Sequence, residues 1–216
     1  MTERLREIFS LLPSCKVFAD VGCDHGYVAK AMLTSGKCDK VIISDISEKC
    51  LDKARELLSA EIAGGRAVAV VSNGFENLPN CDLALIAGMG GEEIVSILKN
   101  AKNLPENLVL QPMKNTQKVR KKIIELGYAV KKDYTFLCGK IFYDLMLVSK
   151  GKDCLTEEEI EFGRTNLKDK PQGFIKFLKL KIKNLITFSK KKDLKQTTKQ
   201  DMEKEAERLS KYVDDN

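Results

Sequence analysis

One short stretch of this 216-residue chain carries the residue types expected of a site for a charged nucleoside. Residues 17–26 read Val-Phe-Ala-Asp-Val-Gly-Cys-Asp-His-Gly, an apolar run that leads into acids and glycines. This order is typical of a buried parallel strand that turns tightly into a helix. Asp20 stands near the expected end of that strand, which is where open α/β sheets bind their ligands.

The turn differs from the G-x-G-x-x-G turn that binds dinucleotides. Gly22 fits the first glycine, but Asp24 and Tyr27 occupy the other two glycine positions. A pyrophosphate needs bare backbone amides at a helix N-terminus, whereas Asp20 and Asp24 add negative charge that favours a cationic ligand. S-adenosylmethionine fits this turn because it has a sulfonium and an ammonium but no phosphate. The residues alone leave open an ordinary turn of another α/β protein.

Two more expected strand ends carry groups that can bind a nucleoside. Asp45 comes 25 residues after Asp20, where a carboxylate can accept hydrogen bonds from both ribose hydroxyls. It can equally belong to a helix cap, because Ser47 is the expected N-cap of the next helix. Asn73 and Gly74 end the third strand, where an amide can pair with an adenine edge or form a simple turn.

The fourth strand is expected to end in a glycine-rich loop, Ala-Gly-Met-Gly-Gly at 87–91. Such a loop lets backbone carbonyls approach a flat base, although glycine-rich loops are common in α/β folds. His25 is the only histidine, and it is a candidate for a base, a helix cap or a cofactor contact. We expect no metal site, because the chain has no Cys-x-x-Cys pair and a single histidine.

The elements that must position these residues alternate between apolar strands and amphipathic helices, as in βαβ units. The last two strands are joined by a short turn at Cys138-Gly139 and must therefore be antiparallel. We predict an α/β fold with the mostly parallel, Rossmann-like sheet of class I methyltransferases, ending in an antiparallel hairpin. Strands are expected from 17 and at 40–45, 67–71, 81–87, 108–112, 128–137 and 140–149, with helices at 3–12, 27–33, 48–63, 92–99 and 116–126.

The composition changes after residue 151, which predicts a domain boundary between 1–151 and 152–216. The second part has no strand pattern and predicts two amphipathic helices in a coiled-coil-like hairpin. Lysines are concentrated in it, with eleven lysines against two aspartates in residues 168–199, so we expect a nucleic-acid partner, although a solvated lysine face is the alternative. The residues expected to contact RNA are Lys114, Lys118, Arg120, Lys176, Lys179, Lys183, Lys190, Lys191 and Lys192.

The chain shows no sign of a membrane or secretory segment. Residues 1–6 are charged, and no apolar run approaches the length of a membrane span. The seven cysteines have irregular spacing, which favours reduced thiols in the cytoplasm. We expect a cytoplasmic monomer that binds neither membrane nor metal.

Four segments in order carry a family resemblance: Asp-Val-Gly-Cys-Asp-His-Gly-Tyr at 20–27, Gly-Met-Gly-Gly at 88–91, Leu-Gln-Pro-Met at 110–113 and Gly-Lys-Ile-Phe-Tyr at 139–143. Together they resemble the bacterial tRNA (adenine(22)-N(1))-methyltransferases. Cys23 and Gly26 stand where serine and alanine are expected, and Asn73 replaces a frequent acid. The resemblance implies an S-adenosylmethionine domain, a C-terminal helical domain that binds tRNA, and methylation of N1 of adenine 22.

The resemblance also implies roles for residues. The carboxylate of Asp24 and the carbonyls of Gly88 and Met89 are the candidates for steadying the methylated base, whose ring becomes cationic. The target base must leave its pair, and Tyr27, Phe75 and Tyr143 are its expected stacking partners. The expected cofactor-binding residues are Asp20, Gly22, Cys23, Asp24, His25, Asp45, Ile46, Asn73, Gly74, Ala87 and Gly88.

Three other classes of function compete with this interpretation. A methyltransferase that acts on another RNA, a small molecule or a protein would share the pocket without needing the basic hairpin. A non-catalytic RNA-binding module on a Rossmann scaffold would not need Asp20, Gly22 and Asp45. An NAD-dependent oxidoreductase is disfavoured by the two missing glycines.

Overall fold

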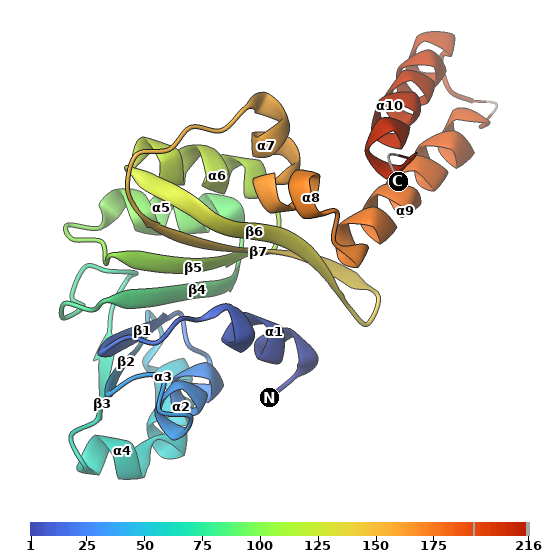
Figure 1. Cartoon of the computed structure of the whole chain (residues 1–216). Coiled ribbons are helices and arrows are strands. Elements are labelled where there is room, and N and C mark those ends of the chain that lie inside the picture. Colours follow the sequence, from blue (N-terminus) through green and yellow to red (C-terminus); the bar gives the residue numbers. More distant parts are fainter. Residues whose placement is uncertain (192, 215–216) are drawn as a thin grey trace.

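The computed structural model describes residues 1–191 and 193–214, which contain one seven-stranded sheet (Figure 1). The strands are β1 (Val17–Val21), β2 (Lys40–Asp45), β3 (Ala67–Val71), β4 (Leu83–Met89), β5 (Asn107–Pro112), β6 (Tyr128–Cys138) and β7 (Ile141–Lys150). Their order across the sheet is β3-β2-β1-β4-β5-β7-β6. Strands β1 to β5 pair in parallel, and β7 is antiparallel to both β5 and β6. The predicted parallel sheet with a terminal antiparallel hairpin is confirmed.

Helices cover both faces of the sheet, because successive strand residues point to opposite faces. Phe18 packs with α1, α2 and α3 on one face, whereas its neighbour Ala19 packs with α5 and α6 on the other. The helices are α1 (Glu3–Leu11), α2 (Tyr27–Thr34), α3 (Glu48–Leu57), α4 (Ser59–Ala63), α5 (Gly91–Asn100), α6 (Thr116–Glu125), α7 (Glu157–Phe162), α8 (Arg164–Asp169), α9 (Gln172–Ser189) and α10 (Gln196–Asp214).

Most predicted bounds within residues 1–151 agree with the structure to within one residue, but two elements differ by more. The single helix expected at 48–63 is wrong, since α3 and α4 are separated at Leu58, whose φ of −104° and ψ of 16° leave the helical region. The break keeps the Leu58 side chain buried and lets α4 contact β3. The strand expected at 81–87 begins at Leu83 and continues through Met89. Gly88 therefore lies in the strand and not in a loop.

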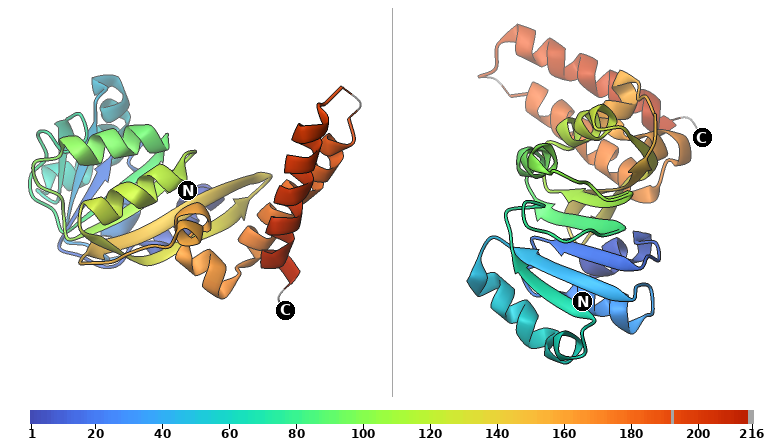
Figure 2. Two further views of the ribbon diagram at one scale, coloured as in Figure 1. Left: turned by 90° about the horizontal axis from the view of Figure 1, so that it is seen from above. Right: turned by 90° about the vertical axis from the view of Figure 1, so that its left-hand side faces the viewer.

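The C-terminal helices fall into two pairs (Figure 2). The short helices α7 and α8 pack on α6 and β6, beside the sheet. The long helices α9 and α10 pack on each other as an antiparallel hairpin that projects away from the sheet. Phe174 and Leu178 of α9 and Leu209 of α10 form its buried core with Phe162 of α7. We call α9 and α10 the helical hairpin.

The β6–β7 hairpin extends beyond the rest of the sheet and supports the helical hairpin. Pairing of β7 with β5 ends at Met146, while pairing with β6 continues to Ile141. The start of α9 rests on this projecting part, where a Cβ on Gly173 would lie 2.8 Å from the Cα of Phe136. A residue with a side chain does not fit at 173 unless α9 moves away from the sheet.

Candidate functional site

The carboxyl ends of β1, β2, β3 and β4 meet at one edge, because these strands are neighbours and run parallel. Asp20 lies in β1, Asp45 ends β2, Asn73 follows β3 and Gly88 lies near the end of β4. The structure thus brings together the four segments that the sequence placed at the ends of separate strands. We call residues 20–27, 45–46, 72–74 and 87–91 the carboxyl edge.

Asp20 is a buried carboxyl group at this edge, with 7% of its surface exposed. Burial raises the pKa of Asp20 to about 7, and a hydrogen bond from the backbone of Ala29 lowers it only in part. A carboxylate taken out of water without a cation beside it is costly. The position therefore favours a ligand that brings positive charge to this edge.

Gly22 makes the turn after β1 with a φ of 75°, which other residues rarely adopt. A Cβ on Gly22 would collide with the methyl group of Met89, whose side chain lies across the turn from β4. The amides of Gly22 and Cys23 both donate to the carbonyl of Ser44, at 2.8 and 3.0 Å. Those two amides are thus already paired within the protein and do not form a phosphate cradle.

Asp24 already has two partners. Its carboxylate lies 2.9 Å from the ammonium of Lys53 and 2.7 Å from Nδ1 of His25. The hydrogen bond from Lys53 lowers the pKa of Asp24, with a smaller contribution from His25. His25 stacks on Tyr27 with ring centroids 5.3 Å apart. The acid, the imidazole and an exposed aromatic ring thus form one polar wall of the carboxyl edge.

Asp45 forms a hydrogen bond within the protein, whereas Ile46 is exposed to solvent. One carboxylate oxygen of Asp45 accepts the amide of Ser47 at 2.8 Å, so its alternative role in the helix start is real. Ser47 itself caps α3 by accepting the amide of Cys50, as predicted. The side chain of Ile46 is 70% exposed. An apolar group this exposed beside a carboxylate suits a ligand with both a sugar and a flat ring.

The segment after β3 is compact. The side-chain nitrogen of Asn73 donates a hydrogen bond to the carboxylate of Glu76 at 2.9 Å. The side-chain oxygen of Asn73 is left as an acceptor. Gly74 packs against Ile97 of α5, where a Cβ would lie 2.6 Å from a methyl carbon. Phe75 is buried in the core with α5 and α6. The prediction that Phe75 stacks on a target base is therefore wrong, whereas Tyr27 is exposed.

Arg4 of α1 reaches the carboxyl edge, a contact that no sequence pattern predicts. Its guanidinium would lie 3.5 Å from a Cβ on Gly88. It also donates a hydrogen bond to the side-chain oxygen Oε1 of the buried Gln111 at 3.3 Å. It also lies over the ring of Tyr143, 5.7 Å from the centroid. A guanidinium and an aromatic ring thus border the end of β4, and a long-range contact of this kind has no local pattern.

Arg120 was expected to contact RNA, and this prediction is wrong. Its side chain is 1% exposed and forms a bidentate ion pair with Asp133 at 2.7 and 3.0 Å. It also donates to the carbonyls of Ile160 and Glu161, at 3.1 Å each. A buried charge needs such partners, so Arg120 fastens α6, β6 and α7 together.

The other expected RNA-binding residues that the structure describes are on the surface. Lys114 is exposed, and Lys118 pairs with Glu92 at 2.6 Å. Lys192 lies outside the described residues. Five lysines of the helical hairpin and its turn are exposed and have no ion pair with any described residue: Lys176, Lys179, Lys183, Lys190 and Lys191.

Two further features limit the kinds of site that the described residues can form. Within residues 1–191 and 193–214, no helix is long and apolar enough to cross a membrane. Over the same ranges, no three histidine, cysteine, aspartate or glutamate residues are grouped so that they could hold a metal ion. The carboxyl edge and the exposed lysines are the features to compare with known proteins.

Comparison with known proteins gives matches over most of the chain. The family described as "Methyltransferase domain" matches residues 1–146. A Mycoplasma pneumoniae protein named "Putative tRNA methyltransferase" is 32% identical over 178 residues, which are 78% of this chain and 82% of that protein.

Two further matches are a curated enzyme that modifies adenine 22 and a solved structure with a bound cofactor product. The Bacillus subtilis tRNA (adenine(22)-N(1))-methyltransferase is 26% identical over 135 residues, 60% of this chain and 57% of that enzyme. The solved structure of TrmK from M. capricolum, in complex with S-adenosylhomocysteine, superposes with a TM-score of 0.85 at 24% identity. It covers 99% of this chain and 98% of its own, so the fold is shared along the whole length.

Proposed function

Because this chain belongs to the methyltransferase-domain family, we propose that it methylates N1 of adenine 22 in tRNA with S-adenosylmethionine. The observation that carries the proposal is the carboxyl edge: a buried carboxyl at Asp20 and a ribose-type acid at Asp45, without a phosphate cradle. The names of the curated relatives supply the substrate class and the position.

The cofactor would lie along the carboxyl edge. Asp20 faces the positive charge of its methionine part, and Asp45 retains an oxygen for the ribose hydroxyls. Ile46 can cover one face of the adenine, and the free acceptor of Asn73 can meet its amino group. The complete proposed set is Asp20, Gly22, Cys23, Asp24, His25, Asp45, Ile46, Asn73, Gly74, Ala87 and Gly88.

S-adenosylmethionine supplies an electrophilic methyl group on a positively charged sulfur. Adenine N1 has an available lone pair, so the protein need not remove a proton before the attack. Its contribution is to position the base in line with that methyl group and to exclude water. Met89 is already the acceptor of the Met113 amide at 2.8 Å, whereas Gly88 falls at an irregularity between β4 and β5. The carbonyl of Gly88 is thus the better placed of the two to face the methylated ring.

Asp24 is the second candidate for stabilising the cationic product. Its ion pairs with Lys53 and His25 hold it in place but offset part of its charge. Because the base must be flipped out of its pair, an aromatic surface is needed beside the edge. Tyr27, stacked on His25, and Tyr143, stacked on Phe136 at 5.5 Å, provide two such surfaces.

The tRNA would be held by lysines of residues 152–216 together with Lys114 and Lys118, because exposed lysines can neutralise phosphates. The lysines proposed for this contact are Lys114, Lys118, Lys176, Lys179, Lys183, Lys190, Lys191 and Lys192. A tRNA substrate places the protein in the cytoplasm, where its seven cysteines stay reduced. One chain carries both the carboxyl edge and the lysines, so a monomer is sufficient.

The test is incubation of the full chain with an unmodified tRNA transcript and methyl-labelled S-adenosylmethionine. We expect label in 1-methyladenosine after digestion, and a stop to reverse transcription at position 22, because the N1 methyl group blocks base pairing. A transcript with guanine at position 22 is the matched control and should take up no label. Label in another nucleoside, or none in the presence of bound cofactor, would refute the proposed reaction.

A further inference from the structure

A cavity lies outside the carboxyl edge, with which it shares no lining residue. It has a volume of about 360 Å³ and lies between the start of α6, the projecting part of the β6–β7 hairpin and α9. This is within the size range of small-ligand sites. The lining residues that matter here are Gln117, Thr135, Phe142, Asp144 and Phe177. We call this space the aromatic cavity.

The walls of the aromatic cavity suit a flat ring. Phe142 of β7 and Phe177 of α9 are 5.6 Å apart, with their planes at 67°. In this edge-to-face arrangement one ring directs its edge at the other, so the pair itself occupies only one face of that second ring. Both side chains are only half-buried. An incoming ring can therefore stack on an aromatic face without displacing a core residue.

The polar part of the cavity accepts hydrogen bonds. Asp144 accepts the hydroxyl of Thr135 at 2.6 Å and takes part in no ion pair with the described residues. The guanidinium of Arg120, also in the lining, is directed to Asp133 and to backbone carbonyls. A carboxylate only accepts, so the cavity favours a ring with N–H donors on its edge.

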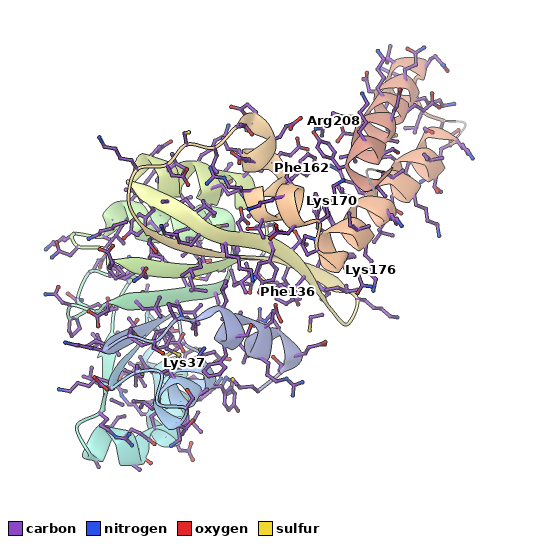
Figure 3. All side chains as sticks on the ribbon, viewed as in Figure 1. Lys37, Phe136, Phe162, Lys170, Lys176 and Arg208 are labelled. Atoms are coloured by element: carbon purple, nitrogen blue, oxygen red, sulfur yellow. The ribbon has the colours of Figure 1, made fainter. Side chains whose placement is uncertain are left out.

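A lysine flanks the cavity on each of two sides, and one of the two, Lys118, also pairs with Glu92. Lys118 follows Gln117 on α6, and Lys176 precedes Phe177 at the start of α9, where Figure 3 shows it beside the end of the β6–β7 hairpin. Both lysines are exposed. A carboxylate and aromatic rings in a cavity with lysines around it fit a nucleobase whose phosphates stay outside.

We propose that the aromatic cavity holds an unpaired nucleobase of the RNA substrate, and that this base is not the one that is methylated. Phe177 stacks on the base, and Asp144 accepts from its amino or ring N–H group. The inference rests on the proposed function for the identity of the RNA. Phe142 and Asp144 line this cavity, while Tyr143 between them contacts Arg4 beside the carboxyl edge. The two bases therefore bind on opposite faces of one hairpin.

The test uses Phe177→Ala and Asp144→Asn in the full chain with unmodified tRNA. Loss of one stacked base costs about 5- to 150-fold in affinity, so we expect KM for tRNA to rise by about that factor in Phe177→Ala. The affinity for S-adenosylmethionine and kcat at saturating tRNA should change less than about twofold. Phe177→Tyr keeps the ring and should restore KM, which a loss of folding would not allow.

Two matched controls lie outside the cavity. Leu180→Ala removes an exposed apolar side chain from the same helix, and Asp39→Asn removes an exposed carboxylate before β2. Both should behave as the unaltered chain. If Phe177→Ala and Asp144→Asn match these controls while the unaltered chain methylates tRNA, the assignment of the cavity is wrong.

A crosslink identifies the base. With p-benzoylphenylalanine in place of Phe142, we expect attachment to one unpaired nucleotide other than the methylated adenosine. With the base of that nucleotide removed from the tRNA, Phe177→Ala should no longer raise KM, because the effects of removing two interacting partners are not additive. A crosslink to a paired nucleotide or to the target adenosine would overturn the inference. A chain that crosslinks as expected but forms no 1-methyladenosine refutes the proposed reaction alone, and a chain that binds no tRNA refutes both.

Discussion

The buried carboxyl of Asp20 allows cofactor binding to be followed as the release of a proton. Burial raises the pKa of Asp20 to about 7, so at pH 6 about nine in ten of these groups hold a proton. A cationic ligand beside the carboxylate lowers its pKa. Binding at pH 6 must therefore release about 0.9 proton, and binding at pH 8 only about 0.1.

The same shift sets the affinity. If S-adenosylmethionine binds the ionised form of Asp20, its Kd is multiplied by about 11 at pH 6 and by about 1.1 at pH 8. We expect about tenfold tighter binding at pH 8. Titration calorimetry at pH 6, in two buffers of different ionisation enthalpy, gives the number of protons directly.

Two variants make the experiment decisive. Asp20→Asn cannot ionise, so its proton release should vanish, whereas His25→Gln removes the imidazole that contacts Asp24 and should keep most of the release. If the unaltered chain and Asp20→Asn release the same number of protons at pH 6, the reasoning about Asp20 is wrong.

The stability of the cofactor-free chain should change with pH in the opposite sense. The pKa of Asp20 is higher in the folded than in the unfolded chain, so the folded state binds the extra proton between these values. Its contribution is complete below about pH 4 and is lost as the pH rises through about 7, and it amounts to about 4 kcal/mol. Asp20→Asn should remove this component of the pH dependence of thermal unfolding.

Three further predictions concern other parts of the structure. Arg120→Ala leaves Asp133 buried without its partner, which should cost about 3–5 kcal/mol of folding free energy and lower Tm by about 6–20 °C. Replacing both residues by leucine should recover much of the lost stability. An unchanged Tm for Arg120→Ala would contradict the buried pair. Gly22→Ala adds strain of about 1–2 kcal/mol at a positive φ and a collision with Met89, so calorimetry should show weaker cofactor binding. Adding Met89→Ala should relieve the collision but not the backbone strain. Full cofactor affinity in Gly22→Ala would refute the tight turn. The last prediction replaces Lys176, Lys179 and Lys183 by alanine. The slope of log K for tRNA binding against log salt concentration should then fall in magnitude by about 2–3, while the affinity for the cofactor stays unchanged as the control. An unchanged slope would exclude these three lysines from the contact with tRNA.

The carboxyl edge was predictable because its signals are local. Asp20 and Asp45 each end an apolar run, and parallel neighbours bring such ends together whatever the details of packing. The sheet was predictable for the same reason, since the short turn at 138–139 fixes the direction of the last strand. Bounds were less certain where packing decides, as at Leu58, where a buried side chain interrupts an otherwise continuous helical pattern.

Arg120 shows how a composition argument can fail. It was counted among the lysines around it, yet it lies on the buried face of α6 with Thr116, Val119 and Ile123. That spacing of three and four residues is itself a signal of burial. Its partner Asp133 lies in a different element, so no local pattern predicts the ion pair. The aromatic cavity was out of reach for the same reason, since residues of α6, β6, β7, α7 and α9 line it.

The projecting β6–β7 hairpin limits which insertions and deletions the chain can accept. Side chains alternate along β7, so Phe142 and Asp144 point one way and Tyr143 the other. One extra residue between Tyr143 and Asp144 would move Tyr143 to the side that faces α9 and Phe142 to the other side, while Asp144, next to the part of β7 that pairs with β5, would stay in place. A change of two residues would keep each set on its own side and alter only the reach. Length variation between related chains should therefore occur here in steps of two.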